Sequence, residues 1–341
     1  MKIAVDAMGG DFAPEATVDG AIQAARVSRG KYEIILVGDE HKIRKELSRF
    51  SIKNLSISIY HASEVIEMEE SPTKALKQKK DASMVVASNL IKKGMADAVV
   101  SAGNTGAFMA TSLLTLGRLP GVLRPGLGSF IPNEEGVCVV IDVGANSDCK
   151  PINMLQFATM GSIYMKYIFD IQNPKVGLLS IGEEESKGNE LVRAAHKLLK
   201  SSSLNFIGNM EGRDILKGTA EVVVCDGFVG NIVLKFAESI IGMFTRTLKK
   251  SVGRNIPANL GAILMKPAFR KLSQLMDYQE YGGVPLLGLN GICIVCHGRS
   301  TPKAIRNAIR EARKMFTLNL NKKLQDALGE NTLQEVGIEF T

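Results

Sequence analysis

Short apolar runs rich in β-branched residues alternate with longer stretches of helical apolar spacing along most of the chain. The short runs predict strands at residues 2–7, 33–37, 55–60, 98–101, 137–143, 176–180, 221–225 and 292–295. The longer stretches predict helices at residues 14–28, 82–93, 105–116, 154–169, 190–199 and 231–247. Most strand segments are apolar without alternation, as in a sheet buried on both faces. The pattern therefore predicts an α/β fold.

The last long periodic stretch predicts one helix from about residue 301 to 328. It carries an apolar stripe and a separate basic face that contains Lys303, Arg306 and Arg310. A solvated helix face explains these cations, and so does a docking site for an acidic helical partner.

A second basic region lies between residues 242 and 275. It holds seven Lys or Arg residues and no Asp or Glu, and it surrounds an apolar run at residues 260–265. With 42 basic and 35 acidic residues, the net charge of +7 can arise from this segment alone. We expect a basic amphipathic helical hairpin at residues 242–280, inserted in a single α/β unit that covers residues 1–341. Membrane contact is expected at the following tip residues: Leu260, Ile263, Leu264 and Met265. The alternative is a tip that packs on a sister subunit.

Composition argues against several protein classes. The chain has no Trp, 6% aromatic residues and no basic stretch interleaved with aromatics, so nucleic-acid binding is not expected. Five scattered cysteines are too few for a disulfide framework and favour a reducing compartment. Cys293 and Cys296 have the spacing of a redox motif, but they lie in a predicted buried strand, so we expect inert thiols. The amino terminus lacks a signal-peptide pattern, and no uninterrupted apolar run approaches 18 residues. We expect no membrane-spanning segment.

Glycine-rich turns follow two of the predicted strands. In an open parallel sheet such turns converge on one cleft at the carboxyl ends of the strands. Glycines allow backbone N–H groups to approach an anion, and a helix amino terminus adds donors and its dipole. The expected phosphate-binding residues are Gly9, Gly10, Ser101, Gly103, Asn104, Thr105 and Gly106, with Asp6 and Asp11 beside them. Tight strand-to-helix connections that need glycine are the alternative.

Other polar residues also follow predicted strands. Lys187 lies behind three acids and can direct an ammonium group at a phosphate or an oxyanion. The alternative is a capping and surface charge cluster. Asn231 and Asp226 lie at the start of a predicted helix, where Asn231 is either an amide donor or an N-cap. His297 is the one histidine expected near the cleft. The dinucleotide, P-loop, α/β-hydrolase and zincin motifs are absent from the sequence.

The chain resembles the bacterial phosphate acyltransferases of phospholipid synthesis. The matching motifs lie in consistent order between residues 5 and 288, at 5–14, 101–107, 142–146, 179–184, 209–212, 226–231 and 281–288. The resemblance implies a Rossmann-like layered sheet similar to the folds of phosphotransacetylases and of isocitrate and isopropylmalate dehydrogenases. It also implies a homodimer that associates peripherally with the cytoplasmic face of the membrane. Asn146, in the third motif, joins the residues expected to line the cleft.

The implied reaction is transfer of a long acyl group from acyl carrier protein to inorganic phosphate. The acyl phosphate would then serve a membrane glycerol-3-phosphate acyltransferase. Because phosphate is the nucleophile, the enzyme needs positioning and electrostatics, without a cofactor or a metal. We assign carbonyl polarisation and oxyanion stabilisation to Lys187 and Asn231, and carrier docking to Lys303, Arg306 and Arg310. A membrane-docked scaffold of lipid synthesis and a decarboxylating dehydrogenase of similar fold are the alternatives.

Overall fold

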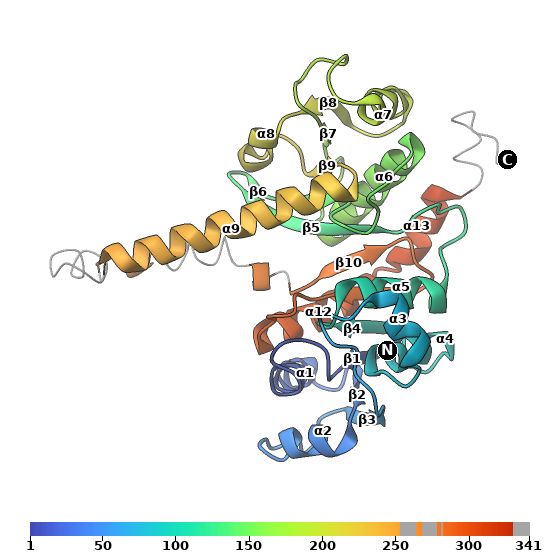
Figure 1. The fold of residues 1–341 in the computed structure, drawn as a ribbon, viewed down its shortest axis with the longest axis vertical. Coiled ribbons are helices and arrows are strands. Elements are labelled where there is room, and N and C mark those ends of the chain that lie inside the picture. The colour runs from blue at the N-terminus through green and yellow to red at the C-terminus, as the bar shows by residue number, and fades with distance from the viewer. Residues whose placement is uncertain (253–263, 268–277, 281, 330–341) are drawn as a thin grey trace.

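The computed structural model describes residues 1–252, 264–267, 278–280 and 282–329. Its centre is an eleven-stranded sheet that runs the length of the molecule (Figure 1). In spatial order the strands are β3 (Ile57–His61), β2 (Glu33–Gly38), β1 (Lys2–Asp6), β4 (Ala98–Ser101), β11 (Ile292–Val295), β10 (Val284–Leu287), β5 (Gly126–Asn133), β6 (Gly136–Ile141), β9 (Val222–Val224), β7 (Val176–Leu179) and β8 (Phe206–Met210).

The sheet consists of two parallel halves of opposite direction. β3, β2, β1, β4 and β11 are parallel to one another, as are β6, β9, β7 and β8. Between the halves, β10 is antiparallel to both β11 and β5, and β5 is antiparallel to β6. The prediction that all of the turns follow strands of one parallel sheet is therefore wrong, because the strands of the two halves run in opposite directions.

Helices cover both faces of the sheet, which confirms the α/β class. One face carries α1 (Glu15–Ser28), α2 (Glu40–Leu47), α6 (Pro151–Ile168), α7 (Glu190–Ser201), α12 (Pro302–Thr317) and α13 (Leu320–Leu328). The other face carries α3 (Pro72–Gln78), α4 (Ser83–Lys92), α5 (Thr105–Leu116) and α8 (Gly212–Lys217). Within β1, Ile3 and Val5 enter one core and Ala4 enters the other, as expected for a strand buried on both faces.

The short helices α2, α3 and α8 were not predicted, and two of the predicted helices differ in extent. The helix expected over 301–328 breaks between α12 and α13, where Asn319 adopts a left-handed φ of 50°. The break turns the buried leucines of α13 onto α6. The helix expected over 231–247 is the longer α9, Gly227–Val252, which projects away from the body (Figure 1).

β5 and β10 were missed because their runs contain Gly or Pro, which are poor strand signals. Gly126 and Gly128 of β5 lie close to the side chains of β6, where a Cβ would make tight contacts at 3.0 and 3.1 Å. β8 was also missed. Of these strands, β10 and β5 determine the direction of the second half of the sheet.

Candidate functional site

A buried carboxylate organises the turns of the first half-sheet. Asp6 is 1% exposed and accepts hydrogen bonds from the hydroxyls of Ser83 and Ser101, both at 2.6 Å. The backbone N–H of Met8 donates to the same carboxylate at 3.2 Å. Ser101 Oγ also accepts from the Gly103 N–H at 3.1 Å. Burial raises the pKa of Asp6, although these donors act in the opposite direction. We refer to these five residues as the Asp6 cluster.

The glycines beside this cluster bring two turns into direct backbone contact. A Cβ at Gly9 would lie 2.4 Å from Asp6 Oδ2 and 2.7 Å from the Gly103 nitrogen, so only glycine fits there. Gly10 has a φ of 107°, and the next N–H, that of Asp11, donates to the Gly298 carbonyl at 2.8 Å. The structure therefore brings Gly9, Gly10 and the turn after β4 together, as predicted.

The start of α5 divides into a structural and an accessible part. Asn104 caps the helix by accepting from the Ala107 N–H at 3.0 Å. Its side-chain NH₂ donates to the carbonyls of residues 67, 68 and 70, so the amide is fully used by the fold. Thr105 and Gly106 are exposed at the helix amino terminus. These two residues are the part of the turn that an anion can reach.

A cation that sequence reasoning missed lies at the same edge. Arg299 follows the turn after β11, and its Nε is 3.9 Å from Asp11 Oδ2. Its side chain is 74% exposed, and the backbone N–H donates to His297 Nδ1 at 3.0 Å. The position of Arg299 after a strand and a glycine was the available signal.

Asp142 occupies the corresponding position in the second half-sheet, after β6. It is fully buried, and its carboxylate accepts from the backbone N–H groups of Leu127, Ala145 and Asn146 at 3.0, 3.1 and 2.6 Å. The Asn146 side chain donates to it at 3.0 Å and to the Pro125 carbonyl at 2.7 Å. Burial raises the pKa of Asp142 despite these four donors. Asn146 is therefore a structural partner of Asp142.

The start of α9 packs directly on this turn. The Gly227 N–H donates to the Asn146 carbonyl at 2.8 Å. A Cβ at Gly230 would lie 1.9 Å from the Asp142 carbonyl oxygen, and a Cβ at Gly227 would lie 2.7 Å from Asp142 Oδ2. Asp142, Asn146 and these two glycines form the Asp142 cluster.

Asn231 is not the N-cap of α9. That position belongs to Asp226, whose Oδ1 accepts from the Val229 N–H at 2.9 Å. Asn231 lies one turn further along and its side chain faces Gly144, where a Cβ would be 3.7 Å from Asn231 Cγ. The Asn231 amide has no hydrogen-bond partner within the described part of the chain.

Lys187 lies in the loop between β7 and α7. Its side chain is exposed, and its backbone N–H donates to the Glu184 carbonyl at 3.0 Å. Across the described ranges its ammonium group forms no ion pair. Lys187 and Asn231 therefore keep their polar groups available, whereas Asn104 and Asn146 do not.

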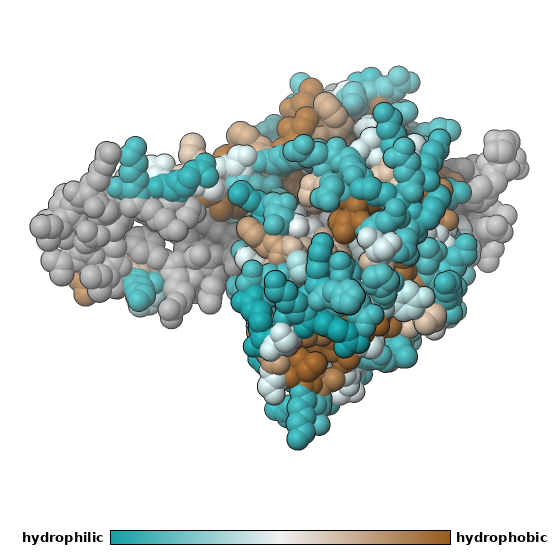
Figure 2. Space-filling view, turned by 60° about the horizontal axis from the view of Figure 1, so that its bottom comes forward, coloured by the Kyte–Doolittle hydropathy of each residue, from teal (hydrophilic) through white to brown (hydrophobic). Residues whose placement is uncertain are grey.

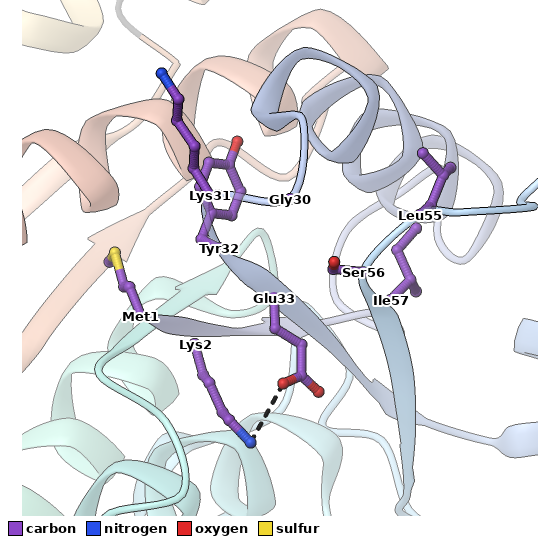
Figure 3. A pocket seen from close by; sticks show the side chains of 9 residues that line it. All are labelled: Met1, Lys2, Gly30, Lys31, Tyr32, Glu33, Leu55, Ser56 and Ile57. Atoms are coloured by element: carbon purple, nitrogen blue, oxygen red, sulfur yellow. Dashed lines mark ion pairs between the residues drawn. The ribbon is translucent and has the colours of Figure 1, made fainter.

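Two hollows mark the surface. One of about 470 Å³ lies at the amino ends of β1 and β2, where Lys2 and Glu33 pair at 3.2 Å (Figure 3). These are the strand ends opposite to the Asp6 cluster. The other, of about 710 Å³, borders the Lys187 loop and is lined by Pro151, Glu185 and residues of α7.

The expected docking residues lie apart from both clusters. Lys303 pairs with Glu280 at 2.6 Å, and Arg310 donates to the Glu280 carbonyl at 3.3 Å, so part of this basic face contacts the chain itself. Arg306 lies near Asn307. Of the expected membrane residues, Leu264 and Met265 are exposed, whereas Leu260 and Ile263 lie outside the described residues.

The cysteines are consistent with inert thiols. Burial raises the pKa of Cys293 and of Cys296 to about 12, and that of the half-buried Cys149 to about 11. These thiols stay protonated at neutral pH, so they are poor nucleophiles.

The sequence profile of the fatty acid synthesis protein family matches residues 1–323. A phosphate acyltransferase of Heliobacterium modesticaldum is 52% identical over 327 residues, which cover 96% of this chain and 97% of the relative. The phosphate acyltransferase of Syntrophotalea carbinolica is 50% identical over 96% of this chain and 94% of its own. A phosphotransacetylase from Streptococcus pyogenes superimposes with a TM-score of 0.62 at 20% identity, covering 93% and 94% of the two chains. The phosphotransacetylase-like fold implied by the resemblance is confirmed.

Proposed function

Since this chain belongs to the fatty acid synthesis protein family and is a phosphate acyltransferase, we propose that it moves a long-chain acyl group from acyl carrier protein to inorganic phosphate. A phosphate oxygen attacks the thioester carbonyl carbon, the C–O bond forms and the C–S bond breaks. The leaving thiolate of the carrier takes up a proton. The product is an acyl phosphate, which we propose is consumed by a membrane glycerol-3-phosphate acyltransferase.

The main support for the site is that two polar side chains remain able to bind a substrate, whereas the polar groups around them are used within the fold. Lys187 and Asn231 are unpaired within the described residues, although their neighbours are hydrogen bonded into the turns. A preorganised ammonium group and an amide N–H can stabilise the oxyanion that forms on the thioester carbonyl. We assign these two roles to Lys187 and Asn231.

Phosphate is assigned to the other half-sheet. Exposed Thr105 and Gly106 offer helix amino-terminal N–H groups, and Arg299 supplies a cation that only weakly contacts Asp11. The attacking phosphate oxygen must contact the thioester carbonyl carbon, so the groups of both half-sheets have to act on one pair of adjacent substrates. We therefore propose that residues 1–341 act as one catalytic unit.

The reaction can be tested with palmitoyl-acyl carrier protein and inorganic phosphate, with hydroxylamine as a trap for acyl phosphate. We expect phosphate-dependent product, and about 100-fold lower kcat for Lys187→Ala and for Asn231→Ala. Lys322→Ala, an exposed lysine on α13, is the matched control. Carrier binding without product would favour the scaffold, and a change in nicotinamide absorbance with a hydroxy diacid would favour the dehydrogenase.

The partner of α9 is proposed from its surface. Exposed apolar side chains recur every four residues on one face of this helix, at Phe228, Ile232, Phe236, Ile240 and Phe244. The first 18 residues of α9 have a mean hydropathy of 1.4, are 11% buried, and are long and apolar enough to cross a membrane by length and composition. Lys235 and Glu238 interrupt this window. On the face of the body shown in Figure 2, hydrophilic side chains cover most of the surface, and the hydrophobic patches are separated from one another.

We assign the α9 stripe to a homodimer interface, because one continuous apolar face suits an identical partner helix better than lipid on all sides. Phe236→Glu should convert the dimer to a monomer in light scattering. Val27→Glu, at another exposed apolar position, should not. A dimeric Phe236→Glu variant would contradict the assignment.

Membrane association is proposed for the segment that includes Leu264 and Met265, at the cytoplasmic face. Both side chains are exposed, at 81% and 53%, and the surrounding sequence is basic. Leu264→Glu with Met265→Glu should abolish sedimentation with phosphatidylglycerol vesicles and leave turnover in solution intact. Leu114→Glu, another exposed leucine, is the control. Unchanged sedimentation would refute the assignment.

Carrier docking remains assigned to Lys303, Arg306 and Arg310. Charge reversal at Arg310, the most exposed of the three, should raise KM for acyl carrier protein and leave KM for phosphate unchanged. An unchanged KM for the carrier would remove Arg310 from the docking surface.

A further inference from the structure

The loop that carries Lys187 is anchored from beneath by two buried side chains. Asn209, at the end of β8, is 7% exposed and donates from Nδ2 to the Glu184 carbonyl at 2.8 Å. His196 of α7 is 4% exposed, and its Nδ1 lies 2.9 Å from Asn209 Oδ1. The Lys187 N–H donates to the same Glu184 carbonyl at 3.0 Å. One carbonyl therefore connects Lys187 to a buried histidine.

The hydrogen-bond directions follow from this chain of contacts. Because Asn209 uses its NH₂ on a carbonyl, its oxygen faces His196, and His196 Nδ1 must carry the hydrogen. The rings of His196 and Phe206 pack in a T-shaped arrangement with centroids 5.1 Å apart, which restricts rotation of the imidazole. His196 thus orients Asn209, and Asn209 holds the loop.

His196 also reaches the loop directly, since its Nε2 lies 3.6 Å from Glu185 Oε1. On the outer side Glu185 pairs with Lys200, both side chains being 63% exposed, and Arg193 donates to the Gly188 carbonyl. Exposed ion pairs contribute little to holding a geometry and are screened by salt. Buried, fully satisfied hydrogen bonds specify one arrangement far more strongly.

We propose that His196 and Asn209 are positioning residues that fix the backbone beside Lys187, and so hold its ammonium group where the thioester carbonyl binds. This inference rests on the proposed role of Lys187. A displacement of a catalytic group by about 1 Å can cost roughly 100-fold in rate. His196 and Asn209 themselves are not assigned any contact with the substrate.

The kinetic test compares two amide replacements. The amide of Asn reaches the Nδ1 position of histidine, whereas the amide of Gln reaches the Nε2 position. His196→Gln should lower kcat by about 30-fold, with KM for phosphate within about twofold, because the donor to Asn209 is lost. His196→Asn should stay within about threefold of wild-type kcat. Both variants remove the imidazole ring, and Asn fills less of its space than Gln, so lost packing alone predicts the larger loss for His196→Asn, opposite to the expected order.

Asn209→Asp and Lys197→Ala complete the set. An aspartate at 209 still accepts from His196 but cannot donate to the Glu184 carbonyl, so we expect a loss of kcat like that of His196→Gln. Lys197 is an exposed residue of α7 that forms no hydrogen bond or ion pair with residues 183–188, and its removal should leave kcat unchanged.

Hydrogen exchange of residues 183–188 supplies a second readout that does not depend on catalysis. We expect faster exchange there in His196→Gln and Asn209→Asp, and near wild-type exchange in His196→Asn. If Lys187→Ala is fully active, the proposed role of Lys187 fails, whereas the exchange data still test the anchor. Wild-type exchange in His196→Gln would overturn the inference. So would a loosened loop with unchanged kcat in an enzyme that needs Lys187.

Discussion

Asp6 and Asp142 are both buried at the end of a strand, one in each half of the sheet, and yet they differ in the donors that surround them. The two shortest contacts of Asp6 come from serine hydroxyls, which can rotate and can either donate or accept. All four donors to Asp142 are N–H groups, and the three in the backbone cannot become acceptors. The Asp6 cluster can therefore adjust to a change in charge, whereas the Asp142 cluster requires an acceptor at its three backbone contacts.

The difference fits the proposed division of work. The edge beside the Asp6 cluster is assigned to a mobile anion, with exposed Thr105 and Gly106 and a weakly paired Arg299. The Asp142 cluster instead holds the start of α9 against the turn, and this placement sets the position of Asn231. A rigid support beneath a catalytic group limits its displacement during the reaction.

Replacing each of the two buried carboxylates by an amide tests the difference between the clusters most directly. Asp142→Asn places an NH₂ group against fixed N–H donors and should lower the free energy of unfolding by about 4 kcal/mol. Asp6→Asn should cost about 1 kcal/mol, because serine hydroxyls can turn to accept. Urea denaturation of both variants measures the difference. Equal losses would show that the direction of the donors does not matter.

A second test addresses the contact between α9 and the Asp142 turn. Gly230→Ala places a Cβ 1.9 Å from the Asp142 carbonyl oxygen, so α9 must shift, and we expect a loss of about 3 kcal/mol in the free energy of unfolding. Gly212→Ala is the control, since no heavy atom lies within 4 Å of a Cβ there. The Gly230 variant should also lose kcat through displacement of Asn231. A variant with wild-type stability and turnover would contradict the tight packing.

Substitution of Arg299 tests whether phosphate binds beside the Asp6 cluster. Arg299→Gln should raise KM for phosphate about 10-fold, or about 1.4 kcal/mol, because one charge-assisted contact is lost. The KM for the acyl donor should stay unchanged. Arg44→Gln removes an arginine of comparable exposure that pairs with Glu40 on α2, and serves as the control. A rise in the KM of the acyl donor alone would move phosphate away from the Asp6 edge.

The smallest expected effect concerns a hydrogen bond between helices of the two halves. The Tyr164 hydroxyl of α6 donates to Glu311 of α12, and burial raises the pKa of Glu311. The Glu311 carboxyl therefore stays protonated in the native state at pH values where the same carboxyl in the unfolded chain, with a pKa near 4.3, is ionised. The contribution of Glu311 is full below about pH 4 and falls as pH rises through the raised native pKa.

Glu311→Gln keeps an acceptor for Tyr164 and removes the titration. Between pH 5 and pH 8 the variant should therefore lose less stability than the wild type, by up to about 1 kcal/mol. Thermal unfolding at both pH values measures the change. An identical pH dependence in the two proteins would exclude Glu311 as its source.

Sequence periodicity located most strands and helices because a buried face requires apolar residues at regular spacing within the element itself. Ala98–Ser101 and Thr105–Leu116 have the predicted bounds, and the glycine turns at Gly9 and Gly103 meet as expected. The break at Asn319 and the strand that begins at Gly126 were missed. In both places a tertiary contact outweighs the local pattern, through the leucines of α13 and the close approach of β6.

The sequence by itself determined the α/β class, the positions of the glycine turns and the residue types able to serve phosphate and a thioester carbonyl. Only the tertiary structure decided which turns share an edge, because the antiparallel β10 and β5 reverse the second half-sheet. It also decided which polar groups are available. Asn146 and Asn231 both follow strands in the sequence, but one amide is bound to Asp142 and the other is unpaired in the described structure. Such differences depend on contacts between distant segments, which no local pattern records.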